Sequence, residues 1–276
     1  MPNFEKLNNP TDGQVITFQD GKPIVPDNPI VPFIRGDGTG VDIWPATQKV
    51  IDASIKYSYR DKRKINWFKV YAGDEACDMY GTYNYLPDDT IEAIRHYGVA
   101  IKGPLTTPVG GGIRSLNVAL RQIFDLYSCV RPCKYYSGTP SPHKSPEDLD
   151  IIVYRENTED IYMGIEWEAE DENCINLIKY INDNVIPKSP KLKNRSLPIN
   201  SGIGIKPVSK FGSQRHIRKA IEHAKQLSGN KRHVTLVHKG NIMKFTEGAF
   251  RDWGYELAIN EFRDDCITER ESWILD

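Results

Sequence analysis

The stretch Ile30-Val-Pro-Phe-Ile-Arg-Gly-Asp-Gly-Thr-Gly40 joins an apolar run to a glycine-rich turn, and it indicates the fold class. Its first five residues predict a short strand, and Pro32 favours an edge position or the start of that strand because proline cannot donate to a ladder. Asp42 and Pro45 then predict a helix that runs to Tyr59. A strand, a tight turn and a helix in this order are typical of a βαβ unit.

The same alternation continues through the first half of the chain. We expect a strand at Ile65–Tyr71, a helix from Pro87, a strand at Val99–Gly103 and a helix at Ser115–Tyr127. The pattern then becomes richer in strands, at residues 127–136, 150–155, 161–167 and 202–206. A helix that begins after Ser209 carries apolar residues at helical spacing, namely Ile217, Ile221, Ala224 and Leu227. These elements predict an α/β fold.

Residues 168–200 differ from their surroundings and resemble an insertion. Their first half predicts an acidic helix with Ile175, Ile178 and Ile181 on one side, and their second half predicts an exposed basic loop. We expect this insertion to take part in subunit contacts.

The composition is that of an ordinary soluble globular protein, with 39% hydrophobic and 26% charged residues. Because 36 Lys and Arg nearly balance 37 Asp and Glu, no global field favours nucleic acid or an anionic membrane. No apolar run is long enough for a transmembrane helix, and no signal peptide is visible. The five cysteines are scattered without a Cys-x-x-Cys pair, so we predict free thiols in a reducing cytoplasm and no zinc site.

The turn at Gly36–Gly40 falls short of the dinucleotide-binding fingerprint G-x-G-x-x-G, because Val41 holds the third glycine position. A tight strand-to-helix turn is the simpler interpretation.

The segment Lys102–Arg121 carries the stronger indication of a ligand site. Its glycines allow a ligand to approach the backbone, and Ser115 sits where a helix begins, with unpaired N–H groups that favour a carboxylate. Asn117 and Arg121 are four residues apart and therefore share a helix face, beside an apolar stripe of Leu116, Leu120 and Ile123. Ser115 as a mere cap and Arg121 as a solvated side chain remain the alternative.

Two further arginines suggest a substrate with several carboxylates. Arg131 ends or interrupts one predicted strand, and Arg155 ends another. Ligands of open α/β folds gather at the carboxyl ends of strands, where three arginines with Ser and Asn donors suit such a polyanion.

Three long motifs carry a resemblance to a known family. Ile101–Gln122, Tyr154–Tyr162 and Val237–Gly248 closely resemble bacterial NADP-dependent isocitrate dehydrogenases, cyanobacterial ones above all, of the isocitrate/isopropylmalate dehydrogenase superfamily. The resemblance extends from about Pro26 to the end of the sequence. It implies that family's fold, whose cofactor site is not the standard dinucleotide-binding one.

The resemblance also implies a division of the chain and a set of partners. Residues 1–126 would form the N-terminal half of a large domain, which is incomplete here. Residues 127–163 and 201–276 would form a smaller α/β domain, and residues 164–200 a clasp between the subunits of a homodimer. The implied activity is oxidative decarboxylation of isocitrate to 2-oxoglutarate with NADP+, in the tricarboxylic acid cycle and in the cytoplasm.

Each matching residue receives a role from the resemblance. Tyr162 and Lys239 would be the catalytic pair, with Lys239 reaching into the other subunit's site. The cofactor would lie against Thr106 and Thr107, with Asn241 and Thr39 as weaker candidates. Isocitrate would be bound by Ser115, Asn117, Arg121, Arg131 and Arg155.

The implied Mg2+ or Mn2+ has no matching carboxylate pair in the sequence, so we expect its ligands beyond residue 276. We therefore interpret the sequence as an N-terminal portion and expect it to have little activity alone. The alternatives are another β-decarboxylating dehydrogenase, such as an isopropylmalate or homoisocitrate enzyme, and an inactive fragment that binds anions or dimerises. Ser115 and Asn117 speak against an isopropyl group, which would leave both unpaired.

Overall fold

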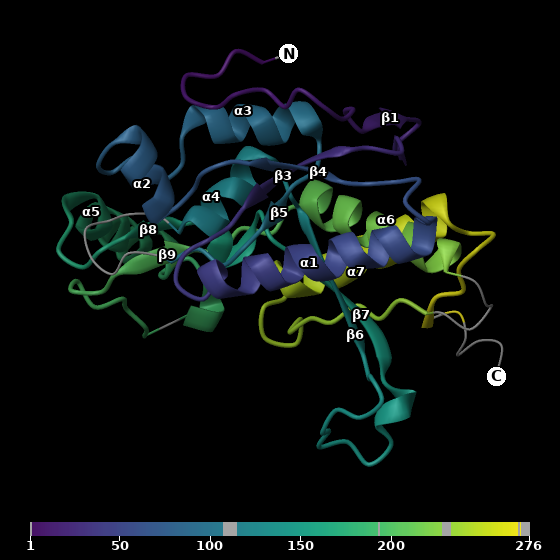
Figure 1. The fold of residues 1–276 in the computed structure, drawn as a ribbon. Helices are drawn as coiled ribbons and strands as arrows, with labels where there is room; N and C mark the ends of the chain where they lie inside the picture. Colours follow the sequence, from purple (N-terminus) through teal and green to yellow (C-terminus); the bar gives the residue numbers. More distant parts are fainter. Residues whose placement is uncertain (1, 107–114, 193, 228–232, 270, 272–276) are drawn as a thin grey trace. The chain divides into compact units, whose positions relative to one another are not determined.

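The computed structural model describes residues 2–106, 115–192, 194–227, 233–269 and 271. The chain divides into two compact units, Met1–Phe124 and Asp125–Asp276, and each is described by itself (Figure 1).

Unit 1 is built on a parallel three-stranded sheet. Its strands are β3 (Ile30–Ile34), β4 (Asn66–Lys69) and β5 (Ile101–Lys102), in the order β4-β3-β5. All five residues of β3 are buried, as expected for the middle strand of a parallel sheet. The predicted strand at Ile30–Ile34 is therefore confirmed, whereas the edge position inferred from Pro32 is wrong.

The register of the sheet explains why Pro32 fits into a middle strand. The carbonyls of Pro29 and Phe33 accept hydrogen bonds from β4 and the residue after it, at 2.8 and 3.0 Å, so alternate residues of β3 face β4. The nitrogen of Pro32 faces the other side, where β5 pairs only with Phe33 and Ile34. Since the β5 ladder begins one residue after Pro32, the missing N–H leaves no ladder bond unmade.

In the described part of unit 1, four helices accompany this sheet, and three of them were predicted. The predicted helices are α1 (Gly40–Tyr59), α3 (Asp88–Tyr97) and α4 (Leu116–Ile123), whereas α2 (Asp74–Tyr80) was not foreseen. The helix α4 ends four residues before the expected Tyr127, and Asp125 just after it has a left-handed φ of 48°. The first residues also hold an unpredicted antiparallel hairpin of β1 (Thr17–Gln19) and β2 (Lys22–Ile24).

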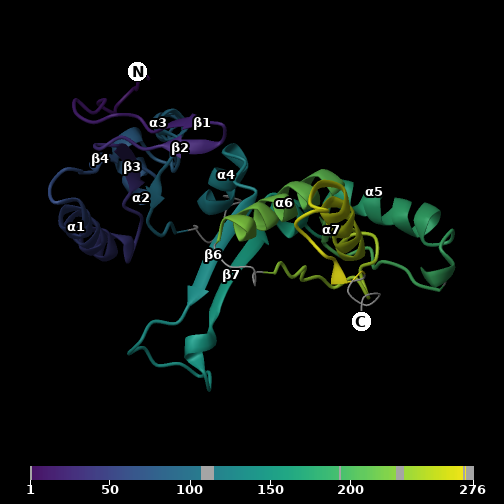
Figure 2. The same ribbon diagram turned by 90° about the vertical axis from the view of Figure 1, so that its right-hand side faces the viewer.

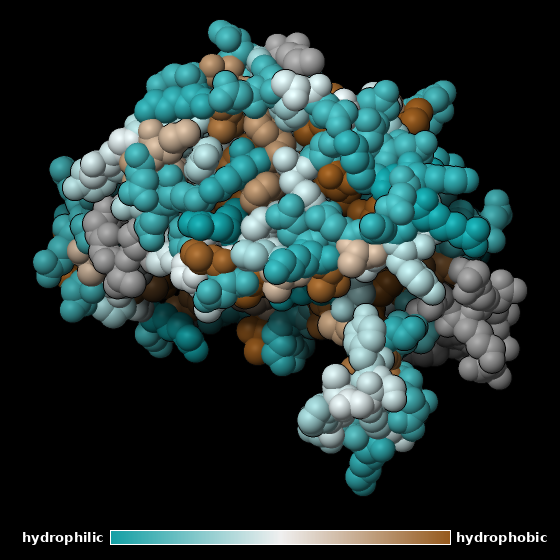
Figure 3. All heavy atoms as spheres, in the orientation of Figure 1, coloured by the Kyte–Doolittle hydropathy of each residue, from teal (hydrophilic) through white to brown (hydrophobic). Residues whose placement is uncertain are grey.

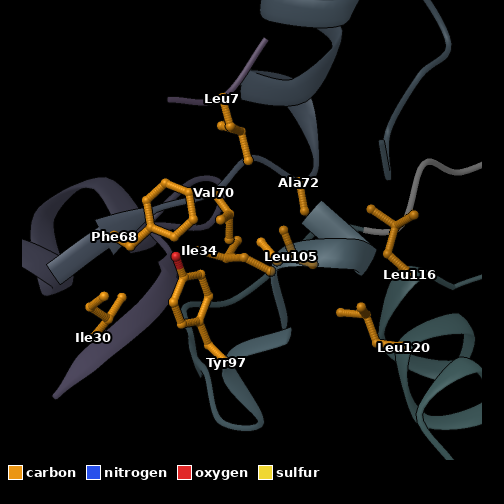
Figure 4. Packing of buried hydrophobic residues seen from close by; sticks show 11 residues of the cluster. Leu7, Ile30, Ile34, Phe68, Val70, Ala72, Tyr97, Leu105, Leu116 and Leu120 are labelled. Carbon is orange, nitrogen blue, oxygen red and sulfur yellow. The ribbon is translucent and has the colours of Figure 1, made fainter. Parts of the chain in front are cut away.

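The core of unit 1 gathers side chains from the sheet, α3, α4 and the N-terminal segment (Figure 4). Leu116 and Leu120 of α4 are 6% exposed, so this helix is packed down by the face that the sequence predicted. Ile123, the third residue of that predicted stripe, is 40% exposed and lies outside the core.

Unit 2 contains a long antiparallel hairpin of β6 (Ser128–Lys134) and β7 (Asp150–Glu156), with a short 3-10 helix, η1 (Pro146–Asp148), in its connection. The helices α6 (Lys210–Gln226) and α7 (Glu247–Glu261) lie side by side, and α6 contacts β7 of this hairpin (Figure 2). Ser209 caps α6 through a hydrogen bond from Gly212 N at 2.9 Å, at the point where the sequence predicted the helix to begin. Ile217 and Ile221 of the predicted stripe are buried against Leu257 of α7, a helix that the sequence analysis missed.

The insertion-like segment is enclosed by two short antiparallel strands, β8 (Ile165–Trp167) and β9 (Ile203–Ile205). It holds α5 (Glu172–Tyr180), a π-helical turn η3 (Ile181–Val185) and a 3-10 turn η4 (Pro190–Leu192). The helix α5 agrees with the prediction, and Ile178 is its most buried isoleucine.

The strand predicted at residues 161–167 is wrong in its first part. Asp160–Met163 form a 3-10 helix, η2. Asp160 and Gly164, at its two ends, adopt left-handed φ values of 59° and 66°, which a regular strand does not accommodate.

The face of the molecule in Figure 3 is largely hydrophilic, with hydrophobic groups scattered between polar side chains. Among the described residues, no helix combines the length and the apolar character that a membrane crossing requires.

Candidate functional site

The residues proposed for ligand binding in unit 1 lie on two loops and on α4. Ser115 is the N-cap residue of α4, and its carbonyl accepts the first helical hydrogen bond from Ala119 N at 2.9 Å. Asn117 and Arg121 follow on the half-buried part of the helix, one turn apart. The helix start predicted at Ser115 is therefore confirmed, and it places N–H groups and a partial positive charge beside this face.

Lys102 adds a second cation near Arg121, and sequence reasoning missed it as a site residue. Its Nζ donates to the carbonyl of Gly103 at 2.6 Å. Burial, followed by the positive charge of Arg121, lowers the pKa of Lys102, while Asp37 opposes the shift. Two neighbouring cations from the opposite ends of the 102–121 motif suit an anionic ligand.

The buried side chain of Asp37 joins the glycine turn to the loop that carries Thr106. Its carboxylate accepts hydrogen bonds from Thr106 N at 2.9 Å and from Asp74 N at 3.0 Å, and its own N–H donates to the Pro104 carbonyl at 2.8 Å. Thr39 and Thr106 are exposed on these connected loops. Thr107 lies outside the described residues.

Glycine is required where these two loops meet. A Cβ on Gly36 would lie 2.2 Å from the Pro104 carbonyl oxygen, and Gly36 also has a left-handed φ of 89°. The stretch Gly36–Gly40 is thus a tight strand-to-helix turn packed against backbone, as the simpler interpretation of the sequence held.

In unit 2, Arg131 and Arg155 lie on one face of the β6–β7 hairpin. Arg131 pairs with Val153, and Arg155 is two residues further along β7, so both side chains project from the same, exposed face. Arg131 was predicted to end or interrupt its strand, and this is wrong, because β6 runs unbroken through Arg131 to Lys134. The antiparallel register, and not a shared carboxyl edge, brings the two arginines together.

These guanidinium groups are available to an anion. Within the part of the chain that the structure describes, neither Arg131 nor Arg155 forms an ion pair, whereas Arg215 and Arg218 are each paired with an acid. The guanidinium of Arg155 lies over the ring of Tyr162, 4.7 Å from its centroid. Tyr162 is half-buried on η2, so contact between a predicted substrate residue and a predicted catalytic residue is present in the structure.

Lys239 and Asn241 lie in a turn just before α7. The backbone of Lys239 is held by Glu247, whose Oε2 accepts from Lys239 N at 3.1 Å. The Lys239 carbonyl accepts from Ile242 N and Met243 N, both at 3.1 Å. Both predicted site residues are exposed, so their side chains are accessible to a ligand.

A separate cavity of about 660 Å³ in unit 2 contains none of the predicted site residues. It is bounded by β7, α6 and residues 233–237, and Tyr154, His216 and His223 line it. The described residues contain no group of three or more His, Cys, Asp or Glu side chains that could hold a metal ion.

The chain is similar to known proteins over most of its length. The chain is 70% identical over 272 residues to the isocitrate dehydrogenase [NADP] of Nostoc sp., covering 99% of this chain and 58% of that protein. It is 69% identical over 271 residues to the protein of the same name from Synechocystis sp., covering 98% and 57%. The crystal structure of isocitrate dehydrogenase from Methylococcus capsulatus is similar, with a TM-score of 0.65 and 35% identity, covering 84% of this chain and 57% of that one.

The chain thus spans somewhat more than half the length of these curated relatives. The family model of isocitrate/isopropylmalate dehydrogenase matches residues 30–270, which include every predicted site residue and most of each unit. The motifs at 101–122, 154–162 and 237–248 all lie within this match, and the chain belongs to the isocitrate/isopropylmalate dehydrogenase family.

Proposed function

We propose that this chain supplies the isocitrate-binding part of an NADP-dependent isocitrate dehydrogenase. That enzyme oxidises and decarboxylates isocitrate to 2-oxoglutarate and CO2, with NADP+ as the hydride acceptor. The observation that carries the proposal is 70% identity over 99% of the chain to a protein of this name. The arrangement of cations and polar donors in both units supports it.

The proposed substrate contacts match the chemistry of a tricarboxylate. Ser115, Asn117 and Arg121 would bind from α4, and Arg131 and Arg155 from the exposed face of the hairpin. Each charge-assisted hydrogen bond to a carboxylate contributes about 1.5–3 kcal/mol. The absence of ion pairs at Arg131 and Arg155 among the described residues leaves both free to make such bonds.

Two residues of unit 2 are proposed to move protons. Lys239 would accept the proton of the substrate hydroxyl when hydride leaves the adjacent carbon, and Tyr162 would protonate the carbon that loses CO2. The guanidinium of Arg155 lies over the Tyr162 ring, so the proposed proton donor is in contact with a cation proposed to bind the substrate. The side chains of Thr39, Thr106, Thr107 and Asn241 are proposed to contact NADP. Of these, Thr39 and Thr106 are exposed on loops joined through Asp37, which fits a ligand that lies across both.

The described residues do not form a metal site, so no step is assigned to the Mg2+ or Mn2+ that the family implies.

We further propose that the protein is a homodimer in which residues 164–200 form the clasp. Several apolar side chains in this segment are exposed, and their burial between subunits would stabilise a dimer. They are Tyr180 (60%), Val185 (43%), Leu192 (37%), Leu197 (36%) and Ile199 (50%).

The decisive experiment compares substrates. The 276-residue chain, and the same chain completed with the remaining sequence of the Nostoc relative, are assayed for NADPH formation from isocitrate with Mn2+ present. We expect the completed chain to oxidise isocitrate with NADP+ and not to oxidise isopropylmalate. Turnover of isopropylmalate, or of neither substrate by a folded completed chain, contradicts the proposal.

A further inference from the structure

Lys206 occupies a central position between the segments that carry Tyr162 and Lys239. It follows β9, and its ammonium nitrogen lies 2.6 Å from Asp160 Oδ2 and 2.7 Å from Glu247 Oε1. Asp160 is the first residue of η2 and Glu247 the first residue of α7. One side chain therefore connects three elements that are separated in the sequence.

The Asp160 end of this bridge fixes the start of the Tyr162 segment. Asp160 N donates to the Pro207 carbonyl at 2.9 Å, and Asp160 Oδ1 accepts from Ile161 N at 2.6 Å. Asp160 holds a left-handed φ of 59°, which costs energy for a residue other than glycine and persists only where neighbours maintain it. Lys206 and Pro207 are those neighbours, and Tyr162 is two residues away.

The Glu247 end fixes the backbone of Lys239. While Oε1 of Glu247 binds Lys206, its Oε2 accepts from Lys239 N at 3.1 Å. The turn after Lys239 is closely packed onto the start of α7, because a Cβ on Gly240 would lie 2.8 Å from Gly248 Cα. Glu247 is thus bonded to Lys206 and to Lys239 at once.

The charges of the three groups reinforce one another. Burial alone would lower the pKa of Lys206, but its hydrogen bonds to Asp160 and Glu247 raise it above the ordinary value. The hydrogen bond from Lys206 lowers the pKa of Glu247 against the effect of burial. All three side chains are partly shielded from water, with 21–36% of each exposed. Such shielding makes a network stronger than an exposed pair of ions.

We propose that Lys206 is a positioning residue that holds the Tyr162 segment and the Lys239 segment in one fixed relation, through Asp160 and Glu247. Lys206 binds Asp160 and Glu247, which accept from Ile161 N and Lys239 N, so it acts on the chemistry through the backbone at each end of the bridge. The inference rests on the proposed function.

Removal of the ammonium group tests the proposal. In Lys206→Met, we expect hydrogen–deuterium exchange of the amides of Ile161 and Lys239 to become at least tenfold faster. The matched control is Lys210→Met, since the ion pair of Lys210 is exposed and joins it to Glu256 at 2.6 Å. Exchange at Ile161 and Lys239 should be unchanged in this control. Unchanged exchange in Lys206→Met overturns the inference without reference to activity.

Kinetics supply the second readout, in whichever form of the chain oxidises isocitrate. Lys206→Met should lower kcat at least tenfold and change KM for isocitrate less than threefold, because it misplaces proton-transfer groups more than binding groups. Lys206→Arg, which can contact both acids, should restore most of kcat. An unchanged kcat in Lys206→Met overturns the positioning role even where the exchange rates rise.

Two further results distinguish failure of the positioning role from misfolding of the variant and from failure of the proposed function. If Lys206→Met fails to fold, Glu247→Gln cuts the same bridge while keeping the side-chain size, and an unchanged Lys239 exchange rate there also overturns the inference. If the unsubstituted completed chain does not oxidise isocitrate, the proposed function fails. The exchange experiment then still reports whether the bridge exists.

Discussion

The carboxylate of Asp37 accepts a hydrogen bond from the backbone nitrogen of Thr106 across 69 residues of sequence, at 2.9 Å. Its other oxygen accepts from Asp74 N at 3.0 Å, and the side chain is almost fully buried. One acid thus fixes the glycine turn, the start of α2 and the loop proposed to face the cofactor.

Asp37→Ala should destabilise the protein by about 1–3 kcal/mol, because it leaves partly buried backbone N–H groups without an acceptor. Urea unfolding measures the free-energy change. Asp42→Ala, an exposed acid in the first turn of α1, serves as the control and should cost about 0.3–1 kcal/mol. Equal losses in the two variants would show that Asp37 does not hold these loops.

Asp89 should make stability depend on pH in the acid range. Burial raises its pKa, but hydrogen bonds from Lys6 N, Glu5 N, Tyr80 and Leu7 N outweigh that effect, so the pKa lies below its unfolded value of 3.8. A lowered folded pKa means that the stabilisation is present above about pH 4 and is lost as the pH falls through the folded value. The urea midpoint should therefore drop more steeply between pH 5 and pH 2 in the unsubstituted chain than in Asp89→Asn. Asp88→Asn, at the exposed neighbour, should retain the steep drop.

Gly240→Ala should destabilise unit 2 by about 1–3 kcal/mol, because the new Cβ would meet Gly248 Cα and His238 Nδ1 at 2.8 Å. Gly204→Ala in β9 is the control, since a Cβ there lies 3.9 Å from its nearest neighbour, within ordinary contact. Thermal unfolding of both variants gives the comparison. A tolerated Gly240→Ala would mean that the turn can move away from α7.

Ser115→Asp should weaken isocitrate binding about a hundredfold or more, while Ser115→Ala should weaken it much less. A second negative charge near a bound carboxylate costs about 4 kcal/mol at close range in a partly shielded site. Titration calorimetry on the form that binds isocitrate gives both affinities. Similar affinities for the two variants would place Ser115 outside the anion site.

Tyr162→Phe and Lys239→Met should each lower kcat about 10²–10⁴-fold with a smaller change in KM, as expected for groups that transfer protons in the transition state. Tyr136→Phe and Lys244→Met, at exposed positions of the same unit, are the matched controls. Steady-state rates with isocitrate decide the matter. A kcat unchanged in both test variants removes the pair from the mechanism.

Elements with a clear period could be predicted from the sequence. Ile217 and Ile221 mark α6, and the unbroken apolar run of Ile30–Ile34 marks β3. The helix α7 was missed because two of its three buried residues are glycines, Gly248 and Gly254, which an apolar period does not register. A Cβ on Gly254 would lie 2.5 Å from Leu236 Cδ1, so this glycine is a packing position.

The candidate site could be predicted from the sequence only where the residue type and its local position indicate a chemical role. Arginines and a serine at a helix start suggest an anion site by themselves. The hydrogen-bond and ion-pair partners of the other site residues are distant in the sequence. The partners of Asp37 are 37 and 69 residues away, those of Lys206 are 41 and 46 residues away, and those of Glu247 are 8 and 41 residues away. No local pattern in the sequence reveals such partners. The place of Arg131 in its strand was wrong for the same reason, because only the pairing of β6 with β7 defines it.

The position of β7 determines two properties of the protein together: the packing of the strand against α6 and the composition of its exposed face. Along β7, Tyr154 turns toward α6 and contacts the rings of His216 and His223, while Arg155 turns to solvent. If β7 shifted by one residue relative to α6, the guanidinium group of Arg155 would lie against those histidines and the Tyr154 ring would become exposed. The charge of Arg155, which is proposed to bind substrate, would therefore destabilise the shifted register. The same residue thus favours the correct register of the hairpin and the exposure of its proposed ligand-binding face.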